Sequence, residues 1–493
     1  MMKKFFEKHD LVKIALCMII FTLLLTWIIP QGYFNAGELT KGEITRIGLF
    51  DFVTYGLLGM YYFTVLVTFL FVTGAFYQFL SKLGAYQKLT DKISKRWKGK
   101  EILFSLIVSF LFAALASMLN EYLILVAFMP FVITICSKLN MNKISSFVMT
   151  FGAMLVGILG STISAKVMGM NVQYLSQSYT THLLEKIILF VLAFAIYSLF
   201  NVRYLLNVKK DSKASSKKET KKDSKKKNAK EETKKEEVVE VKAETDLFAN
   251  KVKNSEKANT IPLIIVGVLA ILTVILAYLP WTSVFKVEWF TKATEWVTGA
   301  KVFGHTIFGY LLGNVNEFGS WDIFGVQVVM VLAIIILQIC YKVSINDTIE
   351  SFAEGFKKAS KLVVVLLLAY VILEFAVMYP VIPTVIGKIL GSKFNVFTTT
   401  ISGLITGLFT SEYQYTVNLV YSFFTTKYAS DLSVVSMILQ STYGLASFVA
   451  PSSAMLLVGL SYLDIPYKDW MKYIWKFLVA MLVVIIVMAF IIK

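Results

Sequence analysis

Charged residues are scarce in this chain. They make up 16% of its 493 residues, whereas roughly 25% is usual for soluble proteins. Hydrophobic residues make up 57% of the chain and aromatic residues 14%. A soluble core cannot bury this much apolar surface, so the excess must face lipid. The composition therefore predicts an all-α polytopic membrane protein whose surroundings are a lipid bilayer.

Cysteine and histidine are also rare. Cys17, Cys136 and Cys340 each stand alone in or beside an apolar run, which excludes a disulfide framework and a CxxC pair. The three histidines are far apart and have no second ligand at metal spacing. The sequence contains no P-loop, GxGxxG, GxSxG or HExxH motif. We therefore expect no metal, no cofactor and no enzymatic activity.

The net charge is strongly positive, at 49 − 32 = +17. Most of the excess lysine and arginine lies in short segments between apolar runs and in one long loop, as the positive-inside rule requires. This distribution argues against a nucleic-acid partner. It predicts a multi-pass protein of the cell (plasma) membrane with its N-terminus, residues 82–100 and the long loop in the cytoplasm.

Apolar runs of about 20 residues are the mark of membrane-spanning helices. The first such run lacks a cleavage site and predicts a helix rather than a signal peptide. Two further stretches, 101–137 and 394–426, are interrupted by polar residues, and two more, 144–178 and 433–463, break at small and hydroxyl residues. The uninterrupted predicted spans are 11–30, 60–80, 183–206, 261–280, 322–341, 362–379 and 471–492.

The chain divides at a long polar loop. Residues 207–260 are almost wholly Lys, Glu, Ser, Thr, Asp and Ala, which predicts a disordered cytoplasmic linker. Residues 1–206 and 261–493 are then two membrane repeats. When basic segments are kept on the cytoplasmic side, 101–137 and 394–426 become re-entrant hairpins that enter from opposite faces, so the repeats are inverted.

An internal match supports this count of crossings. At an offset of 291 residues, Asn120-Glu121-Tyr122 aligns with Ser411-Glu412-Tyr413. Gly160-Ser161-Thr162 then aligns with Pro451-Ser452-Ser453. Inverted-repeat transporters place hairpin tips and broken helices of this kind around a solute.

The candidate substrate- or ion-binding residues lie at these tips and breaks. An ionisable residue within an apolar segment is functional by default, because its burial is costly. The simpler interpretations are turn capping for the glutamates, backbone bonding for the hydroxyls and snorkelling for the lysine. Glu374, within 362–379, has weaker context. The candidates are Asn120, Glu121, Ser161, Thr162, Lys166, Ser411, Glu412, Ser452 and Ser453.

At these residues the chain resembles the YfcC-like carriers, which are grouped with the C4-dicarboxylate anaerobic carriers in the ion transporter superfamily. The resemblance implies a fixed part and a mobile part, elevator-type movement, Na⁺ or H⁺ as coupling ion, and a homodimer. It carries over a binding role to Ser161, Ser452, Ser453 and Glu121. The resembling stretches are Val72–Tyr86, Asn120–Pro130, Gly157–Met170, Ile345–Leu368 and Gln440–Trp470.

One departure from the sequence pattern of the family bears on the identity of the solute. Where the family has an Asn-Pro pair, this chain has Ser164-Ala165 followed by Lys166. Two glutamates and one lysine suit a zwitterionic or cationic amino acid better than a dianion. We therefore expect a secondary transporter or exchanger of a small carboxylate-bearing solute, such as arginine or ornithine. The alternatives are a Na⁺- or H⁺-coupled C4-dicarboxylate carrier and a membrane scaffold protein that transports nothing.

Overall fold

The computed structural model describes residues 10–223, 246–250, 255–313 and 315–493. The basic residues before position 10, on which the expected cytoplasmic N-terminus depends, lie outside this range, as does most of the linker. The described chain is mostly helical. Eight helices in it are long and apolar enough to cross a membrane. They are α2 (Asp10–Ile28), α4 (Thr64–Lys82), α6 (Glu101–Met118), α11 (Leu183–Asp223), α12 (Ile261–Tyr278), α15 (Ile323–Tyr341), α16 (Ile345–Met378) and α23 (Tyr467–Ile492).

Most predicted spans coincide with one of these helices, but the span 60–80 is wrong at its start. A separate helix, α3 (Leu49–Tyr62), ends there, and α4 begins two residues later. Phe63 between them leaves the helical range at ψ 21°. The hydroxyl of Thr64 donates to the carbonyls of Met60 and Tyr61, at 2.6 and 2.9 Å. Such bonds satisfy carbonyl groups at the end of α3.

Both interrupted segments break where the polar residues predict. The helix α6 ends at Met118, and the 3₁₀ helix η1 (Tyr122–Phe128) and α7 (Met129–Lys138) follow. In the second half, α18 (Val396–Phe409) is followed by α19 (Tyr413–Asn418), α20 (Tyr421–Lys427) and η4 (Ala429–Asp431). Re-entry into the membrane at these turns stays a prediction.

The segments with small and hydroxyl residues are also broken helices, as predicted. The first consists of α8 (Lys143–Phe147), the π-helical turn η2 (Val148–Gly152) and α9 (Ala153–Leu159), then a non-helical gap at 160–164 before α10 (Ala165–Leu175). The second consists of α21 (Leu432–Ala446) and α22 (Ala454–Tyr462), with its gap at 447–453.

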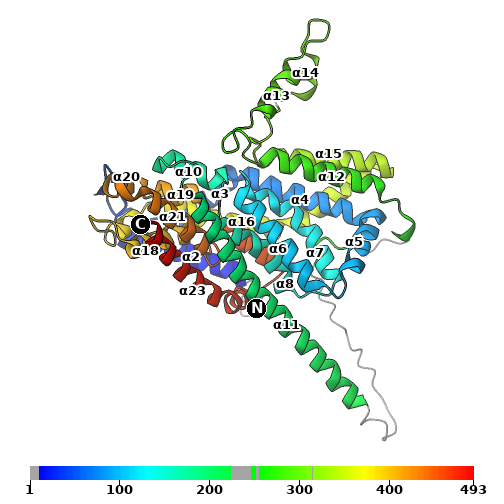
Figure 1. The fold of residues 1–493 in the computed structure, drawn as a ribbon, viewed down its shortest axis with the longest axis horizontal. Helices are drawn as coiled ribbons and strands as arrows, with labels where there is room; N and C mark the ends of the chain where they lie inside the picture. Colours follow the sequence, from blue (N-terminus) through cyan, green and yellow to red (C-terminus); the bar gives the residue numbers. More distant parts are fainter. Residues whose placement is uncertain (1–9, 224–245, 251–254, 314) are drawn as a thin grey trace.

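Several short elements fall in segments for which the sequence predicts none. The strands β1 and β2 pair antiparallel, with Gly32 opposite Lys41. Figure 1 shows α13 and α14 projecting away from the other helices. These elements are β1 (Gly32–Asn35), β2 (Glu38–Lys41), α5 (Gly84–Trp97), η3 (Ser255–Lys257), α13 (Trp289–Gly299), α14 (Ile307–Leu312) and α17 (Ile382–Ile386).

The long helices pack into two groups, each with members from both halves of the chain. In the α16 group, α2, α3 and α4 pack on α16, and α15 joins α4 to α12. Figure 1 shows α4, α12 and α15 side by side. In the α21 group, α9 and α18 pack on α21, α6 packs on α9, and α11 packs on α23. The helix α22 joins them: it lies along α16, while its Gly459 contacts Phe151 of η2.

The closest helix contact in the α16 group depends on glycine. A Cβ atom at Gly355 of α16 would lie 2.5 Å from the backbone nitrogen of Ala75 and 2.6 Å from the carbonyl carbon of Gly74 on α4. Real Cβ atoms do not approach backbone this closely. Small residues at such crossings allow helices to gain contact where the hydrophobic effect between them is weak.

We predict that Gly355→Ala lowers the melting temperature of the purified protein, because α4 and α16 must separate. Overpacking of this kind costs about 1–3 kcal/mol. Gly267→Ala in α12 is the matched control, since a Cβ there meets nothing within 4 Å. Thermal unfolding in detergent measures both variants, and equal melting temperatures would contradict the prediction.

Candidate functional site

Glu121 occupies the turn between α6 and η1. One of its carboxylate oxygens, Oε1, accepts a hydrogen bond from the backbone N–H of Leu123 at 3.0 Å, so the side chain caps η1. The other, Oε2, lies 2.6 Å from the Nζ atom of Lys166. The capping interpretation of Glu121 and the ligand interpretation are therefore both compatible with its position.

Lys166 is the second residue of α10, directly after the break in the first half. Its Nζ atom also lies 3.7 Å from Oε2 of Glu412, and 5.4 Å from the ring centroid of Tyr122. The side chain is 16% exposed, and those of Glu121 and Glu412 are 18% and 19% exposed. The lysine does not snorkel to an open surface, because it is held between two carboxylates.

Glu412 stands at the tip in the second half, at the N-cap position of α19. The hydroxyl of Tyr370 donates to its Oε1 atom at 2.8 Å. The hydroxyl of Tyr443 donates to the backbone carbonyl of Ser411 at 3.0 Å and lies 3.4 Å from the hydroxyl of Tyr122. The two tips and the first break thus meet in one cluster, which we call the charged cluster: Glu121, Lys166 and Glu412.

The charged cluster carries two negative charges and one positive charge when all its members are ionised. Partial burial strengthens the attraction between them, since the effective dielectric constant falls inside a protein. Lys166 is much closer to Glu121 than to Glu412. The excess negative charge therefore lies on the side of Glu412, which has the longer ion pair and accepts a hydrogen bond from the neutral hydroxyl of Tyr370.

The hydroxyl residues at the breaks hold the tips in place. Thr162 donates from its backbone N–H and its hydroxyl to the carbonyl of Ser117, at 3.0 and 3.1 Å. In the second half, the hydroxyl of Ser452 donates to the carbonyl of Leu408 at 2.9 Å. The two acceptors are 408 − 117 = 291 positions apart, which is the sequence offset of the internal match. The hydroxyl of Ser411 donates to the carbonyl of Ser452 at 2.7 Å.

The remaining predicted residues lie at or near the charged cluster but differ in their hydrogen bonds. Asn120 donates to the carbonyl of Gly319 at 2.6 Å and accepts from the N–H of Ala165, so it holds the start of α10. Ser453 caps α22. The buried hydroxyl of Ser161 has no hydrogen-bond partner among the described residues.

Glu374 is not part of the charged cluster. It is buried in α16, and neither carboxylate oxygen has a hydrogen-bond partner within the described chain. A Cβ atom at Gly59 of α3 would lie 3.4 Å from both oxygens. The weaker prediction for this residue is therefore separate from the site at the tips.

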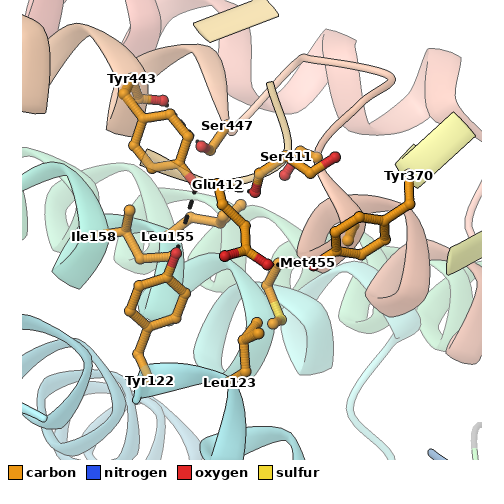
Figure 2. Close-up of a pocket in the computed structure, with 12 residues that line it drawn as sticks. Tyr122, Leu123, Leu155, Ile158, Tyr370, Ser411, Glu412, Tyr443, Ser447 and Met455 are labelled. Atoms are coloured by element: carbon orange, nitrogen blue, oxygen red, sulfur yellow. Dashed lines mark hydrogen bonds between the residues drawn. The ribbon is translucent and has the colours of Figure 1, made fainter. Parts of the chain in front are cut away.

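A small pocket lies beside Glu412. The space inside it that a water-sized group can occupy is about 10 Å³, about the room that one water molecule needs, so the pocket is nearly closed in this conformation. Figure 2 shows the Glu412 carboxylate pointing between the rings of Tyr122 and Tyr370. The pocket is lined by Tyr122, Leu123, Leu155, Ile158, Tyr370, Ser411, Glu412, Tyr443, Ser447, Ser453, Ala454 and Met455.

Three tyrosines that line the pocket were not predicted from the sequence as site residues: Tyr122, Tyr370 and Tyr443. Single tyrosines in apolar helices are usual in cores and at membrane interfaces, so composition offers no signal for them. The one available hint is that Tyr122 directly follows a candidate glutamate.

The family can be assigned from the sequence. The model of the family described as DcuC, C4-dicarboxylate anaerobic carrier, matches residues 9–493. The chain belongs to the C4-dicarboxylate anaerobic carrier family. This assignment confirms the resemblance and makes the protein a membrane transporter. A search of curated protein sequences found no significant match.

Two solved structures match most of the chain at low identity. The YdaH transporter of Alcanivorax borkumensis is 9% identical, with 97% of each chain covered and a TM-score of 0.39. MtrF of Neisseria gonorrhoeae, described as a member of a class of antimetabolite efflux pumps, is 11% identical, with 97% of this chain and 94% of its own covered and a TM-score of 0.39. At these values neither structure bears on the site.

We predict that Lys166→Met destabilises the protein, because it leaves two carboxylates close together without a cation. Removal of one member of a fully buried ion pair costs about 3–5 kcal/mol, and these side chains, at 16% and 18% exposed, are close to that limit. A second substitution, Glu121→Gln, should restore part of the lost melting temperature. Thermal unfolding in detergent measures both variants.

The matched control is Lys292→Met, because the ion pair of Lys292 with Glu288 at 3.1 Å is exposed, with side chains 72% and 66% accessible. Exposed pairs contribute little to stability. A Lys166→Met protein as stable as the Lys292→Met protein would contradict the prediction.

Proposed function

We propose that this carrier exchanges a small solute bearing both a carboxylate and a positively charged amino group, such as arginine or ornithine. The observation that carries the proposal is the composition of the charged cluster. Its single lysine lies 2.6 Å from Glu121 and 3.7 Å from Glu412, so Glu412, beside the pocket, shares that cation at the longer distance and otherwise has a neutral tyrosine donor. A solute with a cationic group would supply the charge that this carboxylate lacks.

Aromatic rings strengthen this proposal. The pocket contains Tyr122, Tyr370 and Tyr443, whose ring faces attract cations. A dianion placed against Glu412 would meet repulsion instead, because like charges at short range are unfavourable inside a protein. The cluster thus discriminates by charge.

The carboxylate of the solute has a separate candidate partner at the start of α22. Ser453 caps this helix, and Ser453 and Ala454 line the pocket. The N–H groups of a first helical turn have no partner within the helix and favour anions. The two ends of an amino acid would then be recognised on opposite walls of one pocket.

Movement is the second part of the proposal. The tips and breaks belong to elements of the α21 group and α22, whereas Tyr370 belongs to α16. We propose that the α21 group carries the bound solute past the α16 group in an elevator-type step. If the carrier catalyses net uptake, Na⁺ or H⁺ is the coupling ion. The proposal also includes inverted repeats in the fold and a homodimer.

The second candidate is a C4-dicarboxylate carrier, which the family description favours. In this alternative, Lys166 and the first turn of α22 would hold the two carboxylates of the solute. The glutamates would then bind the coupling cations. The two candidates differ in whether Glu412 faces the solute or an ion.

The experiment is counterflow in proteoliposomes loaded with unlabelled arginine, ornithine, aspartate or malate, with uptake of the labelled solute followed in the presence and absence of Na⁺. We expect Na⁺-independent counterflow of a basic amino acid. Na⁺-dependent counterflow of malate or aspartate would favour the second candidate. No counterflow of any of these solutes would reject the proposed substrate class.

We further predict that Glu412→Gln raises the apparent KM for the basic amino acid by at least about ten-fold, because loss of one charge from a partly buried pair costs about 2 kcal/mol or more. Lys427→Gln, at the exposed ion pair with Glu38, should leave the KM unchanged. Counterflow at varied solute concentration measures both. If Glu412→Gln leaves the KM unchanged, Glu412 does not contact the solute.

A further inference from the structure

A short piece of the linker is packed against the helices. Residues 246–250 have the sequence Asp-Leu-Phe-Ala-Asn, in a loop that is otherwise rich in lysine and glutamate. Phe248 is only 3% exposed and belongs to the main apolar core. An apolar ring buried at one position of so polar a loop indicates a specific contact, since polar loops bury little on their own.

The ring of Phe248 lies between two tyrosines from different helices. Its centroid is 6.3 Å from that of Tyr77 on α4, in stacked geometry at 26°. It is 6.0 Å from the ring centroid of Tyr462, the last residue of α22. Ring pairs at these distances are favourable beyond the burial of their area.

Polar contacts hold both ends of the segment. At one end, the hydroxyl of Thr134 on α7 donates to Oδ2 of Asp246 at 2.6 Å. At the other end, the side-chain amide of Asn250 donates to Oγ of Ser81 on α4 at 2.8 Å, and the side chain of Gln87 on α5 donates to the Asn250 carbonyl. The segment is therefore anchored at three points along its length.

These anchors connect α4 of the α16 group to α7 and to α22, the helix that joins the two groups. Tyr77 and Ser81 are on α4, which packs on α16. Thr134 is on α7, which follows the first tip, and Tyr462 is on α22, which follows the second break. Figure 1 places α5 and α7 together, near the end of α4 that the basic residues predict to be cytoplasmic.

We propose that the surface formed by Tyr77, Ser81, Thr134 and Tyr462 is a binding site for residues 246–250 of the same chain, and that its occupation restrains movement of the α21 group past the α16 group. The inference rests on the proposed function, because only a carrier needs that movement. The segment would act as a releasable latch on transport.

The size of the contact suits release. Burial of one ring and three polar contacts favour the docked segment, whereas the loss of conformational entropy in five residues opposes it. These two contributions to the free energy of docking are of similar size. A contact of this kind can open while the helices stay folded. The linker would then set the transport rate by controlling how often the latch is bound.

The first test measures docking without transport. Ser81→Cys is introduced into a protein that carries Cys17→Ser and Cys340→Ser, because these native cysteines are exposed whereas Cys136 is buried. The thiol at position 81 should react slowly with a polar maleimide. Phe248→Ala should raise its reaction rate by about five-fold or more, and Ala249→Ser, at an exposed position, should not.

The second test measures restraint in the same cysteine background. Met455→Cys replaces a buried residue of α22 beside Leu366 and Tyr370 of α16, so its labelling reports separation of α22 from the α16 group. Phe248→Ala should raise this rate also, and in the protein with native Met455 it should raise the counterflow rate about three-fold. Asp246→Ala, which removes only one anchor, should act in the same direction with less effect on folding.

The results of these experiments distinguish the binding site for residues 246–250, the restraint on movement and the proposed function from one another. Unchanged labelling of Ser81→Cys in both Phe248→Ala and Asp246→Ala proteins would overturn the binding site. Faster labelling there with unchanged labelling of Met455→Cys would overturn the restraint. Absence of counterflow in the wild-type protein would reject the proposed function alone, because both labelling experiments still decide the latch.

Discussion

The placement of Lys166 between Glu121 and Glu412 is the constraint on which the rest of the structure depends. Charged groups taken out of water are tolerated inside an apolar protein only if they are paired. The three side chains come from the tip of the first half, the break of the first half and the tip of the second half. The first half pairs its own charges, whereas Glu412 of the second half finds its cation, Lys166, in the first half, so its charge is compensated only when the two halves assemble.

The hydrogen bonds of the tips follow from the same requirement. A break in a helix exposes N–H and C=O groups that must find partners when water is absent. Thr162 and Ser452 bond to carbonyls of the facing helix ends, and Ser411 bonds to the second break. These hydroxyls hold the turns that carry the glutamates, and Ser411 also lines the pocket together with the tyrosines.

The sequence predicted the site best at residues that are unusual in a membrane-spanning helix. Glutamates in apolar stretches, and serine or glycine in the middle of a span, identify the tips and breaks because such residues are costly there. Tyr370 carries no such signal, since a tyrosine fits any apolar helix. The break at Phe63 also depends on local hydrogen bonds that hydropathy cannot detect. Phe248, with Leu247 before it, is a short apolar stretch in a loop whose composition predicts no packing. Inverted topology and membrane orientation stay predictions.

The length of α16 has a mechanical consequence. Its 34 residues make a rod of about 51 Å at 1.5 Å per residue, well beyond the roughly 30 Å of hydrocarbon that a bilayer offers. The end with Ser344, Glu354 and Lys358 must then stand in water, next to the last turns of α4. A change of about 10° in the tilt of such a rod would shift that end by about 9 Å. Events at the pocket, which Tyr370 lines, would be magnified at the far end of the same helix, so α16 can serve as a lever arm.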